Sequence, residues 1–454
     1  MPALPAAACP AADITSEADP PEVPRRVAIL GSTGSIGTQA LEVIAAHPES
    51  FDVVALCAGS NVALLTEQVR QFTPGLVGIR DDDAARQLRG ALEDTEPITG
   101  DGGTGTRDDD AGQLLGRRGP TVLTGPEAAQ QIAAESGADV VLNAMTGSIG
   151  LQPTLAALAS GATLALANKE SLVVGGALVR DAVQRPGQIV PVDSEHSALA
   201  QALASGRHQR GLCALPAPGA AQLDGGSEVS RLILTASGGP FRGWAGEQLA
   251  AVTPEQALKH PNFAMGLMVT TNSATMVNKA LEVIEAHLLF DVPLTDIETV
   301  IHPQQYIHSL VEFVDGSTIA QAGPPRMLVP IALGLSWPHR LDQVDTPIDW
   351  THAMSWEFQP LDHSAFPAVR LAKQAAAASA THMAVYNAAN EEAVTAFHAG
   401  RLPFTGILAT VEEVLAAHTG TSGGQADLGT VLEAEEWARR AAEQRIAAAP
   451  GVVR

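Results

Sequence analysis

Several residue types are scarce in this sequence, and their scarcity argues against whole classes of protein. There are only three cysteines, Cys9, Cys57 and Cys213, and no CxxC pair. This argues against a disulfide framework or a structural zinc site, and we expect a reducing cytoplasm. No apolar run reaches the roughly 18 residues that a membrane-spanning helix needs. The opening residues lack the basic start of a signal peptide, so we expect a disordered tail at 1–24.

Positive charge is scarce as well. The formal net charge is -23, and only four residues are lysine: Lys169, Lys259, Lys279 and Lys373. Such an acidic chain is not expected to bind nucleic acid or an anionic membrane. A small phosphorylated substrate is not excluded, because a local site can outweigh the overall charge. Each lysine near a strand end or helix start is therefore a candidate for function.

Length and pattern predict more than one domain. A chain of 454 residues is too long for a single core. Up to residue 190, short apolar segments alternate with helical patterns, which predicts an α/β fold with a doubly wound parallel sheet. The expected strands are 25–30, 51–56, 76–79, 122–123, 139–144, 163–167 and 187–190. The stretches 81–118 and 206–228 are typical of insertions, although 82–92 has a helical pattern.

A glycine-rich turn follows the first expected strand and opens a helix. Gly31, Gly34 and Gly37 give the pattern GxxGxxG, in which backbone N–H groups and a helix N-terminus can approach a pyrophosphate. A plain glycine-rich turn is the alternative. After the second strand, residues 59–61 (Gly-Ser-Asn) offer no carboxylate to repel a 2′-phosphate. The sequence therefore favours NADP over NAD.

Polar side chains also follow the last two strands of this pattern. Asn168 and Lys169 come after the sixth strand and are expected to face the nucleotide crevice. Asp193 and Glu195 come after the seventh. In extended backbone, positions i and i+2 point to the same side, so these two carboxylates would suit Mg²⁺ or Mn²⁺. The alternative is an acidic loop that caps a helix starting near Ser197.

A second polar group is expected on one helix later in the chain. Asn272 or Ser273 is a natural N-cap, where free N–H groups are suited to phosphate. Asn278 and Glu282 are i,i+4 neighbours, and Lys279 lies three positions before Glu282. One helix face thus offers an amide, a cation and a carboxylate. The alternative is a surface ion pair between Lys279 and Glu282.

The rest of the chain predicts an α+β region and then a helical one. The expected strands are 231–235, 298–301, 309–314 and 317–321, the last two forming a hairpin in a mixed or antiparallel sheet. Residues 237–239 (Ser-Gly-Gly) would let a hydroxyl and backbone N–H groups approach an anion. A hairpin sheet of this kind often makes the subunit contact in homodimers. From 367 to 448 the pattern is helical, with residues 387–392 expected between helices.

Six motifs occur in an order that resembles one enzyme family. They are Gly31-Ser32-Thr33-Gly34-Ser35-Ile36-Gly37, Leu166-Ala167-Asn168-Lys169-Glu170-Ser171-Leu172, Pro191 through His196, Ser237-Gly238-Gly239-Pro240-Phe241, Asn278-Lys279 to Glu285, and Asn387-Ala388-Ala389-Asn390-Glu391. From residue 27 to about 404, the chain resembles the 1-deoxy-D-xylulose 5-phosphate reductoisomerases. The resemblance implies a Rossmann-like NADPH-binding domain (25–190), a catalytic and dimerisation domain (191–336), a linker (337–365) and a helical domain (366–454).

The resemblance also implies a reaction and a site. The reaction is the NADPH-dependent isomerisation and reduction of 1-deoxy-D-xylulose 5-phosphate to 2-C-methyl-D-erythritol 4-phosphate, in non-mevalonate isoprenoid synthesis, with Mg²⁺ or Mn²⁺. The implied metal ligands are Asp193, Glu195 and Glu282. Lys169, Ser194 and His260 would contact the substrate, and Ser237, Ser273, Asn278 and Lys279 would hold its phosphate. The dinucleotide would touch Thr33, Gly34, Ser35, Ile36, Gly59, Ser60, Asn61, Asn168, Glu170 and Gly266, beside a lid at 237–266.

The chain departs from the family pattern at several positions. The departures are Phe263, where the family usually has Trp, and Met268, Asn272, Gln305, Arg326 and Leu328. None removes an implied metal ligand or phosphate-binding group. We expect an active enzyme, in which lid packing, dimer contacts or rate could differ.

Two other functions compete with this interpretation. One is an NADP-dependent reductase of a phosphorylated aldehyde without isomerase activity. Thiol-dependent reductases of that kind need a nucleophilic cysteine beside a histidine, and neither Cys57 nor Cys213 lies next to a motif. The other is a non-catalytic NADP-binding paralogue, which the intact carboxylates and lysines argue against.

Overall fold

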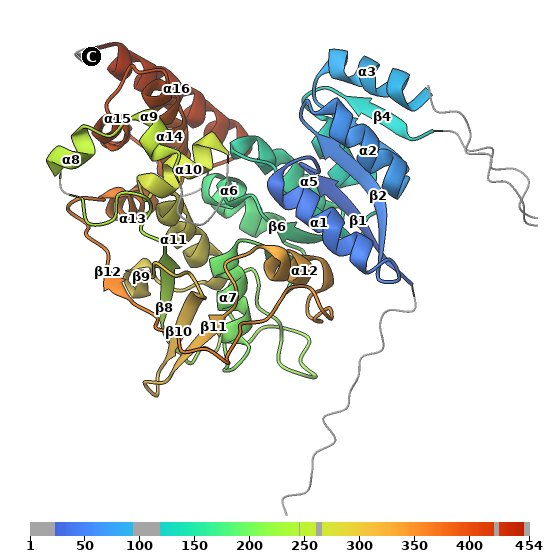
Figure 1. Cartoon of the computed structure of the whole chain (residues 1–454), viewed down its shortest axis with the longest axis horizontal. Coiled ribbons are helices and arrows are strands. Elements are labelled where there is room, and N and C mark those ends of the chain that lie inside the picture. Colours follow the sequence, from blue (N-terminus) through green and yellow to red (C-terminus); the bar gives the residue numbers. More distant parts are fainter. Residues whose placement is uncertain (1–22, 94–118, 245, 260–265, 422–425, 449–454) are drawn as a thin grey trace, which may run out of the picture.

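The amino-terminal part of the chain folds into a seven-stranded parallel sheet, seen at the right of Figure 1. The structure is a computed structural model and describes residues 23–93, 119–244, 246–259, 266–421 and 426–448. The strands are β1 (Arg25–Leu30), β2 (Phe51–Ala58), β3 (Leu76–Ile79), β4 (Thr121–Thr124), β5 (Val140–Asn143), β6 (Thr163–Leu166) and β7 (Ile189–Pro191). Each predicted strand is confirmed, with ends that differ by a few residues. Residues 1–22 of the expected tail at 1–24, and residues 94–118 of the first insertion, lie outside the described residues.

The strand order places a crevice between two halves of this sheet. The order is β4-β3-β2-β1-β5-β6-β7, and every pair is parallel. The order reverses between β1 and β5, and ligands of doubly wound sheets bind at the carboxyl ends of strands beside such a reversal. The accompanying helices are α1 (Ser35–Ala46), α2 (Val62–Phe72), α3 (Asp82–Glu93), α4 (Ala128–Glu135), α5 (Leu151–Ala159) and α6 (Lys169–Ala182). This confirms the predicted Rossmann-like α/β architecture.

The turn after β1 needs glycine for steric reasons. Gly31 has φ +86°, and a Cβ there would lie 2.7 Å from the carbonyl oxygen of Ala144. A Cβ on Gly37 would lie 2.3 Å from the carbonyl oxygen of Gly31. The glycines therefore let β1, its turn and α1 pack closely at the edge where the crevice opens.

The central part of the chain forms a second, mixed sheet, at the lower left of Figure 1. Its order is β11-β10-β8-β9-β12. The strands are β8 (Val229–Ala236), β9 (Ile297–Ile301), β10 (Ile307–Phe313), β11 (Thr318–Ala322) and β12 (Gln359–Pro360). β8 and β9 are parallel, and the other pairs are antiparallel. The predicted hairpin and mixed sheet are confirmed. Residues 337–365 are more than the expected linker, because β12 lies within them and completes the sheet.

Helices of the central part pack against both sheets and against the carboxyl-terminal helices. They are α7 (Ser194–Leu203), α8 (Gly246–Ala250), α9 (Pro254–Ala257), α10 (Leu267–Ala274), α11 (Val277–Phe290) and α12 (Leu328–Ser336), with the 3-10 turn η2 (Leu294–Asp296). Another 3-10 turn, η1 (Ser148–Gly150), lies between β5 and α5. α11 is buried along most of its length. The second expected insertion, 206–228, forms no helix or strand, apart from one bridge between His208 and Ser227.

The carboxyl-terminal part is helical, as predicted, and lies at the upper left of Figure 1. Its helices are α13 (Ala368–Ala378), α14 (His382–His398), α15 (Phe404–Ala417) and α16 (Leu428–Ala448). The prediction that 387–392 lie between helices is wrong, because they fall in the middle of α14. Asparagine usually favours helix ends, but Asn387 and Asn390 are buried and hydrogen-bonded here, so the helix continues through them. Among the described residues, no helix is long and apolar enough to cross a membrane.

Candidate active site

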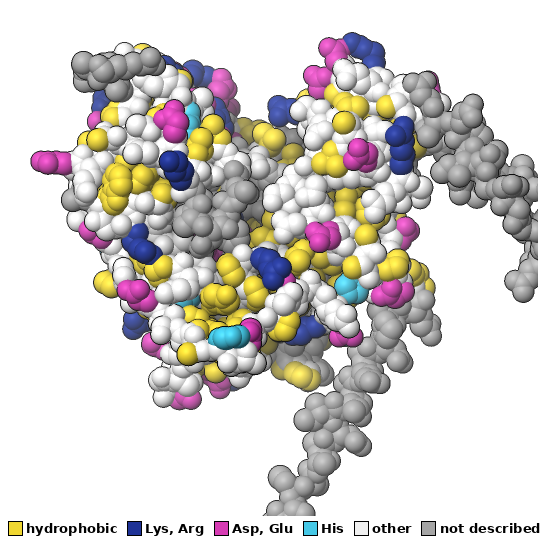
Figure 2. Space-filling view, viewed as in Figure 1, with side chains coloured by type: hydrophobic (Ala, Val, Ile, Leu, Met, Phe, Trp, Pro, Cys, Tyr) yellow, Lys and Arg dark blue, Asp and Glu magenta, His cyan; other side chains and the backbone are white. Residues whose placement is uncertain are grey.

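A cavity of about 730 Å³ opens at the carboxyl ends of β1, β5 and β6. Figure 2 shows the hollow between the two lobes of the molecule. Of the predicted site residues, fourteen line the cavity. They are Gly34, Ser35, Ile36, Lys169, Glu170, Asp193, Ser194, Glu195, Ser237, Gly266, Ser273, Asn278, Lys279 and Glu282. The structure therefore brings together groups from the glycine turn, two helix starts, a strand end and α11. His260 and Phe263 lie outside the described residues.

Three carboxylates form the centre of the cavity floor. Ligand atoms of Asp193, Glu195 and Glu282 all lie within 4.8 Å of one another. Glu282 comes from the buried helix α11, and the other two come from the start of α7. Hard oxygen donors at this spacing suit Mg²⁺ or Mn²⁺. The donor set therefore fits the divalent metal that the sequence predicted.

The predicted backbone at this point is wrong, although the residues converge. α7 begins at Ser194, not near Ser197, so Glu195 is helical and not extended. Asp193 is the N-cap, and its Oδ1 accepts a hydrogen bond of 2.9 Å from the Ser194 N–H. Asp193 thus caps the helix, as the alternative expected, and its side chain is also one of the three clustered carboxylates. The side chains of an N-cap residue and of a residue in the first helical turn can point toward one place, just as residues i and i+2 of a strand can.

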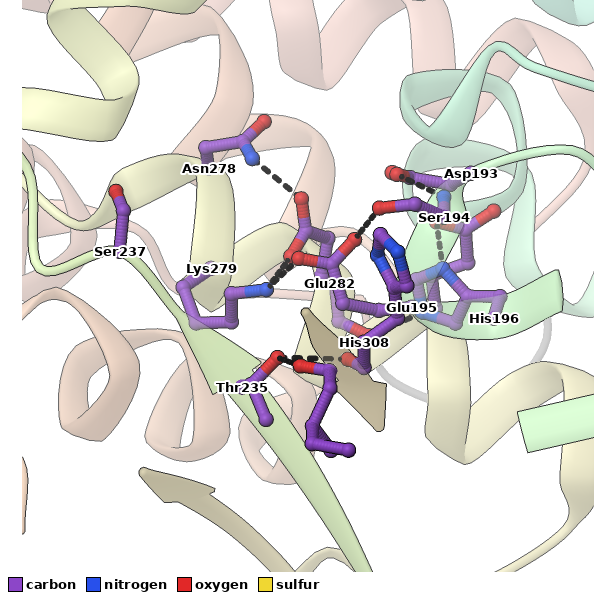
Figure 3. Close-up of polar contacts among 12 residues, drawn as sticks. Asp193, Ser194, Glu195, His196, Thr235, Ser237, Asn278, Lys279, Glu282 and His308 are labelled. Atoms are coloured by element: carbon purple, nitrogen blue, oxygen red, sulfur yellow. Dashed lines mark hydrogen bonds and ion pairs between the residues drawn. The ribbon is translucent and has the colours of Figure 1, made fainter. Parts of the chain in front are cut away.

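Two lysines are paired with the three carboxylates. Lys169 Nζ lies 2.8 Å from Glu282 Oε1 and also pairs with Asp193. Lys279 Nζ lies 2.5 Å from Glu195 Oε1 and also pairs with Glu282 (Figure 3). The predicted alternative of a surface pair between Lys279 and Glu282 is wrong, because both side chains are buried. Each carboxylate thus has a lysine partner, and the cluster carries one excess negative charge when all five groups are ionised.

The environment separates the acidities of neighbouring carboxyls. Burial alone would raise the pKa of Asp193, but the Lys169 ammonium group outweighs it and holds that pKa well below its usual range. Burial, together with the negative charge of Glu282, raises the pKa of Glu195 to about 7, although Lys279 opposes the shift. Asp193 is therefore ionised at all physiological pH values, whereas Glu195 exchanges its proton near neutrality.

A second buried pair, which the sequence did not single out for a role, lies beneath the carboxylates. His196 Nε2 is 2.8 Å from the backbone carbonyl oxygen of Glu282, and its Nδ1 is 3.2 Å from Glu285 Oε2. Burial lowers the pKa of His196 and raises that of Glu285 well above its usual range. A neutral imidazole that donates from Nε2 to a carbonyl leaves Nδ1 to face a protonated Glu285. Asp193, His196 and Glu285 form a second group that could hold a metal. A protonated Glu285 is a poor ligand, and of the two groups only the three carboxylates all line the cavity.

The candidate phosphate-binding residues lie at one end of the cavity. The prediction that Ser273 lies at the start of a helix is wrong, because Ser273 lies in the last turn of α10. α11 begins at Val277, after Met276 adopts the left-handed conformation with φ 64°. Gly239 brings the turn after β8 against this point, since its Cβ would lie 2.9 Å from the carbonyl oxygen of Ser273. Ser237 and Ser273 therefore line one wall through close backbone packing.

The predicted dinucleotide residues fall into two groups. The residues Gly34, Ser35, Ile36, Glu170 and Gly266 line the cavity, whereas Thr33, Gly59, Ser60, Asn61 and Asn168 are not among the lining residues. Asn61 caps α2 by accepting from Leu64 N–H, and residues 59–61 follow β2 at the same sheet edge. Asn168 is fully buried, and its Nδ2 donates to the carbonyl oxygens of Met145 (2.7 Å) and Gly147 (3.0 Å). It shapes the loop after β5.

Some lining residues were missed by the sequence reasoning. They include Gln39, Met145, Thr146, Met276, Pro325 and Met327. Met145 and Thr146 follow β5, and the rule that singled out the residues after β6 would have found them. Gln39 is one helical turn beyond Ser35. No feature of the sequence indicated Met276, Pro325 or Met327. They reach the cavity through contacts between domains, and hydrophobic periodicity does not predict such contacts.

Comparison with known proteins identifies the family. The model for 1-deoxy-D-xylulose 5-phosphate reductoisomerase matches residues 27–108 and 109–176. The model for the C-terminal domain of that enzyme matches 189–290, and the DXP reductoisomerase C-terminal domain model matches 322–441. Together these matches cover most of the chain.

Similar proteins that carry this family's name are found in several bacteria. The chain is 56% identical over 427 residues to the 1-deoxy-D-xylulose 5-phosphate reductoisomerase of Pseudarthrobacter chlorophenolicus, covering 93% of this chain and 98% of that protein. It is 52% identical over 426 residues to the protein of that name from Streptomyces coelicolor, covering 93% of this chain and 92% of the other.

Solved structures agree. The reductoisomerase from Zymomonas mobilis in complex with NADPH has a TM-score of 0.77 and 36% identity, covering 94% of this chain and 100% of that one. A reductoisomerase in complex with NADPH, fosmidomycin and magnesium has a TM-score of 0.78 and 34% identity, covering 93% and 98%. The chain belongs to the 1-deoxy-D-xylulose 5-phosphate reductoisomerase family.

Proposed function

We propose that this cavity converts 1-deoxy-D-xylulose 5-phosphate to 2-C-methyl-D-erythritol 4-phosphate with NADPH and a divalent metal. The observation that carries the proposal is the position of the carboxylate cluster. It lies in one cavity with the glycine turn after β1 and with the group Ser237, Ser273, Asn278 and Lys279. A dinucleotide, a metal and a phosphorylated substrate can therefore meet at one point. Related proteins of this name, one of them bound to NADPH and magnesium, support the same conclusion.

Asp193, Glu195 and Glu282 would hold Mg²⁺ or Mn²⁺. When bound, the metal supplies Lewis-acid stabilisation of the negative charge that develops on two adjacent substrate oxygens during the rearrangement. Ser194 Oγ donates a hydrogen bond of 2.5 Å to Glu195 Oε2, and this hydroxyl, next to a ligand, would contact the substrate. All three carboxylates are at least largely buried, so they form a preorganised donor set.

Lys169 would polarise the substrate oxygens as a positive charge. Its Nζ lies among Asp193, Glu282 and Asn278 Oδ1, the last at 3.0 Å. Burial would lower the pKa of Lys169, but Asp193 and Glu282 outweigh it and raise that pKa well above its usual value. The side chain is therefore a fixed cation close to the reacting oxygens. His260 is proposed as a further substrate contact from the family resemblance.

The substrate phosphate would bind to Ser237, Ser273, Asn278 and Lys279. Two hydroxyls, an amide and an ammonium group are suitable donors for a phosphate dianion. Binding the end of the substrate that does not react fixes the orientation of the end that does. The overall acidity of the chain makes this local group the principal source of phosphate affinity.

NADPH would bind along the glycine turn and across the crevice. α1 begins at Ser35 with no side-chain cap, so its first N–H groups are available to the pyrophosphate. Thr33 to Ile36, residues 59–61 and Glu170 would complete the site, with Gly266 on the opposite wall and Asn168 holding the loop after β5. The absence of a carboxylate in residues 59–61 favours the 2′-phosphate of NADPH.

A homodimer would form through the edge of the second sheet. β11 is the terminal strand, its residues are mostly exposed, and none of them is charged. Ile319 and the neighbouring hairpin residue Val314 are 39% and 71% exposed. An uncharged, exposed edge strand is a surface that native proteins usually cover. Ile319→Lys should therefore convert a dimer to a monomer, as measured by light scattering after gel filtration.

We also propose a cytoplasmic location, where the described cysteines Cys57 and Cys213 would stay reduced.

The test is turnover by the purified protein with identification of the product. With 1-deoxy-D-xylulose 5-phosphate, NADPH and Mn²⁺, we expect NADPH oxidation and formation of 2-C-methyl-D-erythritol 4-phosphate by NMR. Glu282→Gln should lose turnover and still bind NADPH, because it removes a metal ligand and leaves the glycine turn intact. Glu42→Gln, on the exposed face of α1, is the matched control. No turnover by the wild-type protein, or metal-independent reduction of an aldehyde alone, would refute the proposal.

A further inference from the structure

The motif in the middle of α14 has no role in the site described so far. Asn387 and Asn390 are buried, with exposed fractions of 2% and 0%, and the Glu391 carboxylate is largely buried. Polar side chains in the middle of a helix lose free energy on burial unless they are hydrogen-bonded. Each of the three is hydrogen-bonded, and two of them reach toward the walls of the cavity.

Asn390 contacts the wall that carries Ser273. Its Nδ2 donates a hydrogen bond of 2.9 Å to Oδ1 of Asn272, which lines the cavity next to Ser273 in the last turn of α10. A second bond joins the same helices, since Thr271 Oγ1 lies 2.7 Å from His398 Nε2. Two consecutive residues of α10 are thus attached to α14 just before the serine proposed to bind phosphate.

Glu391 contacts the opposite wall. Its Oε1 accepts from Asn387 Nδ2 at 2.9 Å, and its Oε2 accepts from Arg439 of α16 at 2.5 Å. A Cβ on Gly147 would lie 3.5 Å from Glu391 Oε1, so the loop after β5 passes close to this carboxylate and a side chain at 147 would touch it. Met145 and Thr146 of that loop line the cavity. The loop is held from its other side by the amide of Asn168.

Consecutive residues of a helix point in directions about 100° apart. Asn390 and Glu391 can therefore contact two different walls from one turn of α14. We propose that they are positioning residues: Asn390 fixes the phosphate-binding end of α10, and Glu391 fixes the loop on the dinucleotide side. α14 would then set the separation between the two bound molecules that exchange hydride. This inference deepens the proposed function and rests on it.

The experiment separates the two walls by measuring two binding constants. Asn390→Asp keeps the side-chain size but removes the donor to Asn272. We expect its substrate KM to rise about tenfold, the effect of one lost buried hydrogen bond, while the Kd for NADPH stays within about twofold. Glu391→Gln should do the reverse: a several-fold increase in the NADPH Kd, measured by fluorescence, with an unchanged substrate KM.

Glu392→Gln is the matched control for Glu391→Gln. Both glutamates pair with Arg439, but in the described structure only Glu391 lies close to Gly147. A purely structural ion pair predicts equal effects, whereas positioning predicts that Glu392→Gln lowers Tm comparably and leaves both constants unchanged. Thr271→Val, a nearly isosteric change, should raise the substrate KM a few-fold and serves if Asn390→Asp does not fold.

These measurements test the proposed function and the positioning role of Asn390 and Glu391 separately. Failure of the wild-type protein to turn over would refute the proposed function. With an active wild type, the positioning proposal is overturned if Asn390→Asp, or Thr271→Val in its place, leaves the substrate KM unchanged. It is also overturned if the Asn390 and Glu391 variants move both constants together, or if Glu392→Gln matches Glu391→Gln in NADPH affinity.

Discussion

Acidification should weaken the binding of Mn²⁺ through a single carboxyl, Glu195. Burial and the charge of Glu282 raise its pKa to about 7, so a proton competes with the metal for this ligand in the neutral range. The sign follows from the ligand being an anion: lowering the pH protonates Glu195 and removes a donor. Asp193 does not contribute, because Lys169 keeps its pKa far below this range.

The magnitude follows from one-proton linkage. With a pKa of about 7, the apparent Kd for Mn²⁺ should be about tenfold higher at pH 6 than at its high-pH plateau, and about twofold higher at pH 7. Above pH 8 the curve should be flat. His196 stays neutral over the upper part of this range, because burial lowers its pKa. The slope between pH 6.5 and 8 therefore belongs to Glu195.

The assay is a titration of Mn²⁺ into the protein without substrate, with binding measured by calorimetry or electron paramagnetic resonance. It is repeated at half-unit steps from pH 6 to 8.5. Glu195→Gln should bind Mn²⁺ more weakly at every pH and lose the slope. Glu285→Gln controls for the other buried carboxyl with a raised pKa and should keep the slope. A Kd that is constant across the range, or a slope that survives in Glu195→Gln, would refute the reasoning.

Three further perturbations test other parts of the site. Lys279→Met removes the partner of two buried carboxylates; breaking such pairs costs about 3–5 kcal/mol, so we expect a lower Tm by calorimetry, together with a higher substrate KM. Gly239→Ala should destabilise the fold by more than about 1 kcal/mol, because φ is +65° and the added Cβ meets Ser273. Gly243→Ala, with φ +79° and no described atom within 4 Å of the new Cβ, should lower the free energy of unfolding by less, as measured by urea denaturation. An equal decrease for both variants would contradict the packing argument. Ser60→Asp should raise the KM for NADPH about tenfold and spare NADH, through repulsion of the 2′-phosphate; equal effects on both cofactors would place that phosphate elsewhere.

The first domain was predictable because its signals are local. Buried parallel strands are short apolar runs, and each is closed by glycine or a polar residue. The strand 163–167 was expected and β6 spans Thr163–Leu166, so Asn168 and Lys169 were correctly placed at a sheet edge. β12 was not predictable, since a strand of only two residues is too short to show an alternating pattern. Their strand character comes from pairing with β9.

The residues of the site were predictable to a larger extent than their backbone. Glu282 was named from family resemblance, and α11 does bring it to Asp193 and Glu195. The i,i+4 bond between Asn278 and Glu282 followed from helix geometry alone. No local pattern, however, indicates that Glu285 and His196 meet beneath these carboxylates, because that contact joins two helices far apart in sequence.

Ser273 lines the cavity, as expected, but not for the reason that the sequence suggested. The sequence Asn272-Ser273 has the composition of an N-cap, and propensity alone would start a helix there. The structure instead ends α10 at Ala274 and starts α11 at Val277, with Met276 in the left-handed conformation between them. A non-glycine residue with positive φ costs about 1 kcal/mol or more and persists only where packing requires it. The requirement here is tertiary: Gly239 approaches the carbonyl of Ser273, while Asn390 holds Asn272 from the other side. The break between α10 and α11 thus lets Ser273 and Lys279 line the same cavity. In one continuous helix these two residues, six positions apart, would point in directions about 120° apart.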